Sequence, residues 1–345
     1  MASAVSSHPP LSVALVGATG LVGETILEVL AERDFPVSRL LPLASRRSSG
    51  RTLRFRGEEL AVREAEPAAF EGVDLVFFAA TGSLSKELAP EAVTRGAVVI
   101  DKSNTWRMDE RVPLVIPEIN PAALEEHEGI IACPNCTTIG VAMALEPLRR
   151  AAGLRRVVVT TLQATSGAGR EASEELEAQL AALARNEEPV ATVFPSPIAH
   201  NVLPLCERFD PDDDGYSTEE MKLLHETRKI LGEPDLDVSM TCVRVPVPVG
   251  HSASLLVECE RALSPEKARS ALDAFPGVRV VDDCARNVFP TPRDVAGGDE
   301  VLVGRVRRDL TSERLWLWQV IDNLRKGAAT NGVQIAETLI ERGLL

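Results

Sequence analysis

The stretch "CPNCTT" holds the most reactive group of side chains in the sequence. Cys133 and Cys136 have the CxxC spacing that serves zinc binding, disulfide exchange or nucleophilic attack by one thiolate. Cys136 follows the apolar run "IIA" and opens a helical pattern, which predicts that it lies at a helix N-terminus. There the helix dipole and the free N–H groups lower the pKa of a thiol and can form an oxyanion hole. The position favours a nucleophilic cysteine.

The two other chemistries find less support. A structural zinc site needs about four ligands with a second closely spaced pair. No histidine pair has that spacing, and the other cysteines are isolated, namely Cys206, Cys242, Cys259 and Cys284. We therefore predict no metal site. Disulfide exchange stays open as an alternative. It is weaker than the nucleophilic interpretation because a thioredoxin-like fold has no need of the glycine-rich turn found far upstream. Cys133 is interpreted as a bystander that faces the sheet.

A nucleophilic thiol needs a proton acceptor within hydrogen-bond reach. Of five histidines, His251 follows a glycine at the break between two apolar runs, where a side chain can leave a sheet. His200, in "PIAHN", is the rival candidate. The remaining three lie in the N-terminal segment or in polar contexts typical of solvated surfaces: His8, His127 and His225. We expect His251 to be the partner of Cys136.

The fold that positions these side chains begins with the stretch "LSVALVGATGLVGETILEVLAERD". An apolar strand, a glycine turn and a helical pattern follow one another, as a dinucleotide site requires. Gly17 permits the tight turn, Gly20 lets a pyrophosphate approach the backbone, and Gly23 lets helix and strand pack closely. The spacing is GxxGxxG rather than GxGxxG. The residues expected to contact the cofactor here are Gly17, Thr19, Gly20, Leu21, Val22 and Gly23.

The end of the second strand predicts which dinucleotide binds. NAD sites usually carry a carboxylate there for the ribose 2′-hydroxyl. This chain has "SRRSSG" instead, with Ser45, Arg47 and Ser48 as the candidate contacts. Guanidinium groups give forked, charge-assisted hydrogen bonds to phosphate oxygens. The pattern therefore favours NADP.

The order of strands and helices predicts an α/β fold, with a Rossmann-like doubly wound parallel sheet and a second, α+β catalytic and dimerisation domain. Strands are expected at 74–81, 97–100, 114–116 and 129–132, a hairpin over 51–65, and a helix over 83–96 capped by Ser83. The predicted domains are 11–135 with 324–345 for the cofactor and 136–323 for catalysis and dimerisation, after a flexible leader, 1–10.

Composition excludes several classes of protein. The 345 residues carry a formal net charge of -14, which argues against a nucleic-acid surface. No apolar run approaches the ~18 residues of a membrane-spanning helix, and the N-terminus does not resemble a signal peptide. We expect a cytoplasmic protein. Trp316 and Trp318 share one strand face, and an apolar open sheet favours a homodimer or a dimer-based tetramer.

Several motifs taken together resemble one enzyme family. They are "GATGLVG", "LASRRSSG", "PEIN", "CPNCTT", "QATSGAG", "PVPVGHS", "DNLRKGAA" and "VQIAE", from about Leu11 to the C-terminus. Together they resemble aspartate-semialdehyde dehydrogenases. The resemblance implies the reversible, NADPH-dependent reductive dephosphorylation of L-aspartyl-4-phosphate to L-aspartate 4-semialdehyde and inorganic phosphate through a cysteine thioester. This reaction serves the biosynthesis of lysine, threonine and methionine.

The resemblance also implies roles for individual residues. Cys136 is the nucleophile and His251 the acid–base group. Substrate contacts are implied for Asn135 and Gln163 at the carbonyl, Arg107 and Lys222 at the phosphate, Arg244 at the α-carboxylate and Glu219 at the α-amino group. Further cofactor contacts are implied for Ser83, Ser166, Gly167 and Asn323. Three residues depart from the common family pattern: Lys102 in place of asparagine, Thr81 near the nicotinamide side, and His200 where an aromatic residue is frequent.

Two alternative functions stay open. One is N-acetyl-glutamyl-phosphate reductase, which shares the acyl-phosphate chemistry. Its acetylated substrate does not need an acid such as Glu219, whereas a free amine does. The other is a non-catalytic NADP-binding relative, against which the presence of both Cys136 and His251 argues.

Overall fold

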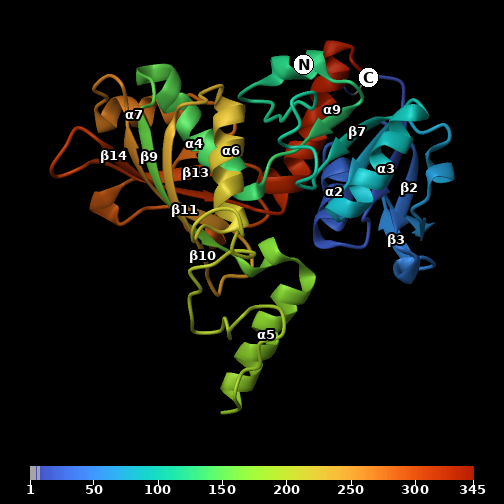
Figure 1. Cartoon of the computed structure of the whole chain (residues 1–345), viewed down its shortest axis with the longest axis horizontal. Coiled ribbons are helices and arrows are strands. Elements are labelled where there is room, and N and C mark those ends of the chain that lie inside the picture. The colour runs from blue at the N-terminus through green and yellow to red at the C-terminus, as the bar shows by residue number, and fades with distance from the viewer. Residues whose placement is uncertain (1–4, 6–7) are drawn as a thin grey trace. The chain divides into compact units, whose positions relative to one another are not determined.

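The computed structural model describes Val5 and residues 8–345. The predicted leader, 1–10, therefore lies largely outside the described residues, which omit 1–4 and 6–7. The chain forms two compact units (Figure 1). The first unit contains the residues up to Asn135 together with Ala328–Leu345, and the second contains Cys136–Gly327. The chain thus passes from the first unit to the second immediately before Cys136.

The first unit is built on a six-stranded sheet in the order β5-β2-β1-β6-β7-β8, and every pairing in it is parallel. Its central strands are buried apolar runs, as expected where helices cover both faces of a parallel sheet. The predicted doubly wound parallel sheet is confirmed. Its strands are β1 (Leu11–Val16), β2 (Val37–Ala44), β5 (Arg63–Glu64), β6 (Leu75–Phe78), β7 (Val98–Asp101) and β8 (Ile130–Ala132).

Helices and one hairpin complete the first unit. α2 packs with α9, which also contacts β7, while α3 packs against β6 and β7. The predicted hairpin is confirmed as an antiparallel pair of strands. The elements are α2 (Leu21–Glu32), α3 (Gly82–Thr94), α9 (Thr330–Arg342), β3 (Thr52–Phe55) and β4 (Glu58–Ala61). Short 3-10 turns are η1 (Arg46–Ser48), η2 (Pro67–Phe70) and η3 (Pro121–Glu126).

Local predictions in this unit were wrong at two places. The expected strand 114–116 is reduced to a single bridge between Leu114 and Ala132. The prolines that flank it, Pro113 and Pro117, have no N–H group to donate to a ladder. The helix expected to begin at Ser83 begins at Gly82, with Thr81 as its N-cap residue. Ser83 lies in the first turn, and its hydroxyl is 3.1 Å from that of Thr81.

The second unit is built on a mixed sheet in the order β10-β9-β11-β14-β13-β12. The pairs β10–β9 and β12–β13 are parallel, and the three central pairs are antiparallel. This confirms an α+β second domain. The strands are β9 (Arg156–Gln163), β10 (Asp237–Arg244), β11 (His251–Glu258), β12 (Val278–Val280), β13 (Val301–Arg308) and β14 (Leu315–Ile321).

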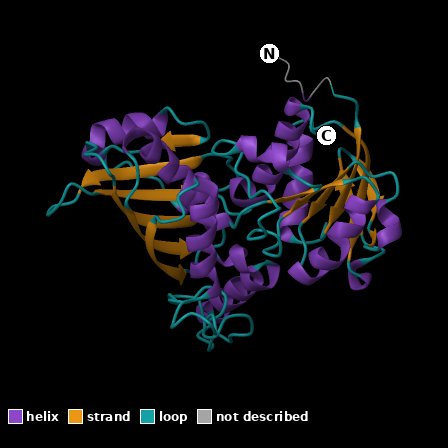
Figure 2. Cartoon of the chain, turned by 45° about the horizontal axis from the view of Figure 1, so that its top comes forward, coloured by secondary structure: helices purple, strands orange, loops and turns teal. Residues whose placement is uncertain are grey.

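The helices α6 and α7 each pack with α4, and all three pack against this sheet (Figure 1). α5 instead extends away from the sheet, and both views show irregular segments beside it (Figures 1 and 2). The elements are α4 (Cys136–Ala152), α5 (Arg170–Ala184), α6 (Thr218–Leu231), α7 (Pro265–Asp273), α8 (Pro292–Val295), η4 (Thr165–Ala168) and η5 (Cys284–Arg286). A π-helix, η6 (Arg325–Ala329), precedes α9, where a single final helix was expected.

Sequence signals explain how α6 is bounded. Ser217 forms a capping box with Glu220, and Gly232 ends the helix in the left-handed conformation at φ 67°. α4 continues through Pro147, although a bend or break was expected there. Across Val5 and residues 8–345, no helix combines the length and the apolar character needed to span a bilayer.

Candidate active site

The second unit brings Cys136 and His251 together. Cys136 is the first residue of α4, and its Sγ lies 3.3 Å from Nε2 of His251 at the start of β11. Burial and the positive charge of Arg244 lower the pKa of His251 well below its ordinary value, so the imidazole is neutral at pH 7. His200 is exposed at a turn with φ 57°, so the imidazole that contacts Cys136 is that of His251.

The surroundings of His251 fix how its ring is protonated. The main-chain N–H of Ala164 donates to Nδ1 at 3.0 Å. Nδ1 therefore carries the lone pair, and in the neutral ring the proton is on Nε2, facing the sulfur. Gly167 gives this ring its space, because a Cβ there would lie 2.8 Å from Cε1 of His251 and 3.0 Å from Nη1 of Arg244. A neutral His251 is thus a hydrogen-bond donor to Cys136.

A buried polar network surrounds Glu219 on α6. Its carboxylate accepts hydrogen bonds from Oγ1 of Thr137 at 3.3 Å and from Nε2 of Gln163 at 3.2 Å. Gln163 ends β9, and the same Nε2 lies 3.3 Å from Oγ1 of Thr161. Thr137 directly follows Cys136, so this network connects α6, β9 and the start of α4. Glu219 is 4% exposed, so its carboxyl group is held inside the site.

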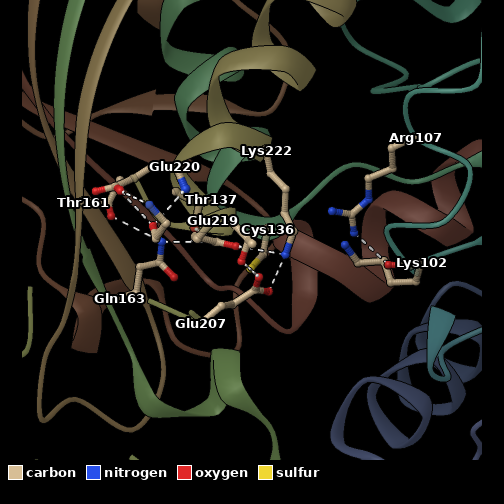
Figure 3. Close-up of polar contacts among 12 residues, drawn as sticks. Lys102, Arg107, Cys136, Thr137, Thr161, Gln163, Glu207, Glu219, Glu220 and Lys222 are labelled. Atoms are coloured by element: carbon tan, nitrogen blue, oxygen red, sulfur yellow. Dashed lines mark hydrogen bonds and ion pairs between the residues drawn. The ribbon is translucent and has the colours of Figure 1, made fainter. Parts of the chain in front are cut away.

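Lys222 lies one helical turn after Glu219 and is paired with two carboxylates. Its Nζ contacts Oε1 of Glu207 and lies 3.5 Å from Oε2 of Glu219. Figure 3 shows the three side chains pointing toward one another near Cys136. The other oxygen of Glu207 accepts from Oγ1 of Thr218 at 2.6 Å. An expected cation of the site is therefore held by Glu207, which the sequence analysis did not identify.

Arg244, at the end of β10, is a buried cation. Its Nη1 donates to the carbonyl of Ala164 at 2.6 Å, and its guanidinium carbon lies 5.9 Å from the centre of the Phe194 ring. Within the described part of the chain, its buried Nε has no hydrogen-bond partner. A buried donor without a partner is costly, so this group suits an anion supplied by a ligand.

In the first unit, two cations hold the segment that leads to the nucleophile. Nε of Arg107 donates to the carbonyl of Cys133 at 3.1 Å, and Nη2 donates to that of Lys102 at 2.8 Å (Figure 3). Nζ of Lys102 donates to the carbonyl of Pro134 at 2.5 Å. Asn135 ends this segment and is 9% exposed. The departure at Lys102 thus has a structural use, since its side chain fixes the turn before Asn135.

The glycine turn has the geometry that a dinucleotide needs. Gly17 has φ 85°, and a Cβ there would lie 2.2 Å from the carbonyl oxygen of Ala79. A Cβ at Gly23 would lie 2.3 Å from the carbonyl oxygen of Gly17, so both glycines are required by packing. Gly20 differs, because a Cβ there would meet only that same oxygen, at 3.5 Å. Gly20 is also the N-cap residue of α2, and in the described chain no side chain caps it. The helix N-terminus can receive a phosphate.

The other predicted cofactor residues lie in two places. Ser45, Arg47 and Ser48 follow β2, next to β1 in the parallel sheet, so they share an edge with the glycine turn. Arg47 is exposed there, as a contact to a 2′-phosphate requires. In the second unit, Nδ2 of Asn323 donates to Oγ of Ser166 at 2.9 Å, while its Oδ1 accepts from the N–H of Gly250 at 2.9 Å. Asn323 therefore also holds the residue before His251.

Sequence reasoning missed Glu207, Phe194 and the Ala164 amide. Glu207 and Phe194 lie on irregular segments of the chain. Ala164 acts through its main chain, which no side-chain pattern reveals, although it lies within the quoted "QATSGAG".

Comparisons with known proteins match both units of the chain to one family. Residues 12–127 match the family "Semialdehyde dehydrogenase, NAD binding domain", and residues 145–326 match "Semialdehyde dehydrogenase, dimerisation domain". The aspartate-semialdehyde dehydrogenase of Bacillus subtilis is 48% identical over 344 residues, which cover 97% of this chain and 99% of that protein.

Solved structures show the same similarity. A Vibrio cholerae aspartate semialdehyde dehydrogenase II, described as complexed with ASA, has a TM-score of 0.93 and 44% identity, covering 96% of this chain and 99% of that one. The Candida albicans aspartate semialdehyde dehydrogenase, described as a structure with NADP, has a TM-score of 0.76 and 25% identity, covering 97% and 100%.

Proposed function

Because the chain belongs to the aspartate-semialdehyde dehydrogenase family, we propose that it catalyses the reversible, NADPH-dependent conversion of L-aspartyl-4-phosphate to L-aspartate 4-semialdehyde and inorganic phosphate. The observation that carries the proposal is the 3.3 Å contact between Sγ of Cys136 and Nε2 of His251 at the start of α4. A helix N-terminus and an N–H donor both stabilise a sulfur anion.

The first half-reaction follows from that pair. The Cys136 thiolate attacks the acyl carbon, and the bond to the phosphate oxygen breaks. Inorganic phosphate leaves, and a thioester forms on Cys136. A thioester accepts hydride far more readily than a carboxylate does, which is why a cysteine is required. We assign Asn135 and Gln163 to hold the substrate carbonyl.

The second half-reaction reduces the thioester to the aldehyde. When bound, the dinucleotide supplies the hydride. Hydride addition leaves a tetrahedral oxyanion on Cys136, and as its carbonyl re-forms the carbon–sulfur bond breaks, the aldehyde leaves, and the electron pair stays on sulfur as a thiolate. His251 holds the Nε2 proton beside the sulfur, so the departing thiolate is stabilised by a hydrogen bond.

Four charged residues match the three charged groups of the substrate. We assign Arg244 to the α-carboxylate, since its buried Nε has no partner within the described chain. Glu219 is assigned to the α-ammonium, because it is a buried acidic residue that an acetylated amine would not need. Arg107 and Lys222 are assigned to the phosphate. Glu219 is the feature that favours an aspartyl substrate over an N-acetyl-glutamyl one.

The cofactor is assigned mainly to the first unit. The open space at Gly20 and the uncapped start of α2 suit a pyrophosphate, and we propose that Thr19, Leu21 and Val22 contact it from the same turn. Ser45, Arg47 and Ser48 would hold a 2′-phosphate, which makes NADP the preferred dinucleotide. Ser83, Ser166, Gly167 and Asn323 are proposed to line the nicotinamide end.

We further propose that the second unit dimerises through the open face of its sheet. Gln319 and Ile321 of β14 point toward Gly140 on α4. Trp316 and Trp318 have the opposite parity and are half-buried, so they belong to the face that α4 does not cover. A second copy of the chain would cover these aromatic side chains. A dimer or a dimer-based tetramer is consistent with the description of the matched domain.

The test compares both acyl phosphates and both protein forms. Wild type is expected to reduce aspartyl phosphate with NADPH and not N-acetyl-glutamyl phosphate. Mass spectrometry of the quenched reaction should find an aspartyl adduct on Cys136. The Cys136→Ala variant should lose turnover and still bind NADPH. Equal, near-zero rates for wild type and variant would instead support a non-catalytic, cofactor-binding protein.

A further inference from the structure

α5 and the irregular segment after it contain none of the residues assigned to the proposed reaction. Glu175 and Gln179 lie one turn apart on α5 and are 6% and 1% exposed. Such polar side chains are rarely buried unless they bind specific partners. Both bind the segment 190–199, which forms neither helix nor strand.

Glu175 binds the first half of this segment. Its carboxylate accepts from the N–H groups of Thr192 and Val193 at 2.7 and 2.5 Å, from that of Phe194 at 3.5 Å, and from Oγ1 of Thr192 at 2.6 Å. Burial alone would raise the pKa of Glu175, but these hydrogen bonds outweigh it and lower the pKa. The carboxylate is therefore a charged acceptor around which the backbone is folded.

Gln179 binds both ends of the segment. Its Oε1 accepts from the N–H groups of Ile198 and Ala199 at 2.8 and 2.9 Å. Its Nε2 donates to the carbonyl of Val190 at 2.9 Å and to Glu175 at 3.0 Å. Ile198 and Ala199 also pack on Leu176 of α5. The side chains of Glu175 and Gln179 thus supply the main chain of segment 190–199 with hydrogen bonds that a helix or sheet would otherwise provide.

The segment held in this way contacts Arg244 through Phe194. Phe194 lies beneath its guanidinium at 5.9 Å. Leu203, just beyond the segment, pairs with Arg244 through both main-chain hydrogen bonds, at 3.0 and 2.8 Å. The guanidinium of Arg244 makes a cation–π contact with Phe194, and its Nη1 donates to Ala164. Its buried Nε has no hydrogen-bond partner in the described chain.

We propose that Glu175 and Gln179 are positioning residues that, by holding Phe194 against Arg244, set the affinity of the site for the α-carboxylate of the substrate. The proposal rests on the proposed function, because it takes aspartate semialdehyde as the ligand of Arg244. The residues act through Phe194 and do not touch the reacting atoms.

The test uses two aldehydes that differ only at the carboxylate. We would measure the NADP- and phosphate-dependent oxidation of aspartate semialdehyde and of 3-aminopropanal, which lacks the carboxylate. The proteins compared are wild type, Glu175→Gln, Gln179→Met and Phe194→Leu. For the three variants, KM for aspartate semialdehyde should rise about 3- to 30-fold, the range of one cation–π contact, with kcat within about twofold. Their kcat/KM for 3-aminopropanal should stay at the wild-type value.

The matched control is Glu177→Gln, the same chemical change at an exposed position of α5. It should behave as wild type with both aldehydes. Phe194→Leu leaves both hydrogen-bonded residues intact, so it tests the proposal even if the α5 variants unfold.

The outcomes separate the two proposals. Losses of equal size for both aldehydes would mean general structural damage and would overturn the inference, as would variants that match the control. A wild type that oxidises neither aldehyde would refute the proposed function, and the inference with it.

Discussion

The main-chain N–H of Ala164 donates to Nδ1 of His251 across 3.0 Å. A second proton on the ring would have to go on Nδ1, where it would face another donor. The imidazolium is therefore disfavoured by geometry as well as by burial. We therefore infer that in the resting site His251 acts as an N–H donor to sulfur rather than as the base that first deprotonates the thiol.

This arrangement predicts how stability depends on pH. The pKa of His251 is lowered well below 6.5 by burial and then by Arg244, so only the unfolded chain binds the proton just below pH 6.5. Stability is then lost as the pH falls through 6.5 toward the folded pKa, by about 1.4 kcal/mol per pH unit at most. Denaturant unfolding of wild type and His251→Asn between pH 7.5 and 5.5 measures it. Parallel slopes for the two proteins would contradict the argument.

Cofactor preference should depend on Arg47. It is exposed at the end of β2, next to the strand that leads into the glycine turn. Arg47→Ala is expected to lower kcat/KM for NADPH about tenfold and to leave that for NADH nearly unchanged, because one charge-assisted contact to the 2′-phosphate is lost. Arg54→Ala, on the exposed hairpin, is the control. Equal losses for both dinucleotides would argue against a 2′-phosphate site.

Glu207 should compete with phosphate for Lys222. Its carboxylate contacts Nζ directly, and its φ of 64° is a conformation that non-glycine residues rarely adopt. Glu207→Gln keeps the shape and removes the charge, so KM for phosphate in the oxidative direction should fall about threefold. Asp214→Asn, exposed in the same segment, should change nothing. If KM rises in the Glu207 variant, the carboxylate positions Lys222 instead of competing.

Gly167 should be required for activity more than for folding. An added Cβ would displace His251 and Arg244, from which it would be 2.8 and 3.0 Å away. We expect Gly167→Ala to lower kcat/KM about 100-fold, as misplacement by roughly 1 Å can do. Thermal unfolding should shift little, since the residue is exposed. The adjacent, exposed Ala168→Ser is the control. Near-normal activity in Gly167→Ala would show that the ring and guanidinium can move aside.

The sequence predicted an element correctly where its local pattern of residues allows few other places in a fold. Buried strands followed by glycine turns predicted the parallel sheet, because such apolar runs have few other stable arrangements. The segment 114–116 looks like a strand by composition, but the prolines on either side have no N–H group to donate, and the fold gives it only the bridge from Leu114 to Ala132. Pro147 fits inside α4, although proline usually interrupts a helix.

For the candidate site, the side chains named from the sequence were those with charge or nucleophilicity beside a recognisable motif. Cys136 and His251 were named from different parts of the chain, and the structure brings them within 3.3 Å. Glu175 and Gln179 were not distinguished, because glutamate and glutamine are common on solvated helix faces. Only the tertiary fold shows that these two face inward.

Gly327 and Cys136 are the last and first residues of the second unit, and a Cβ on Gly327 would lie 3.1 Å from that of Cys136. The second unit is therefore a domain inserted into the sequence of the first, and its two ends lie next to each other. Ends this close are easily joined, so a circular permutant of 136–327 closed by a few residues is geometrically simple. Cys136 is itself one of these two ends, so a linker that joins residue 327 to residue 136 would lie directly before the nucleophile.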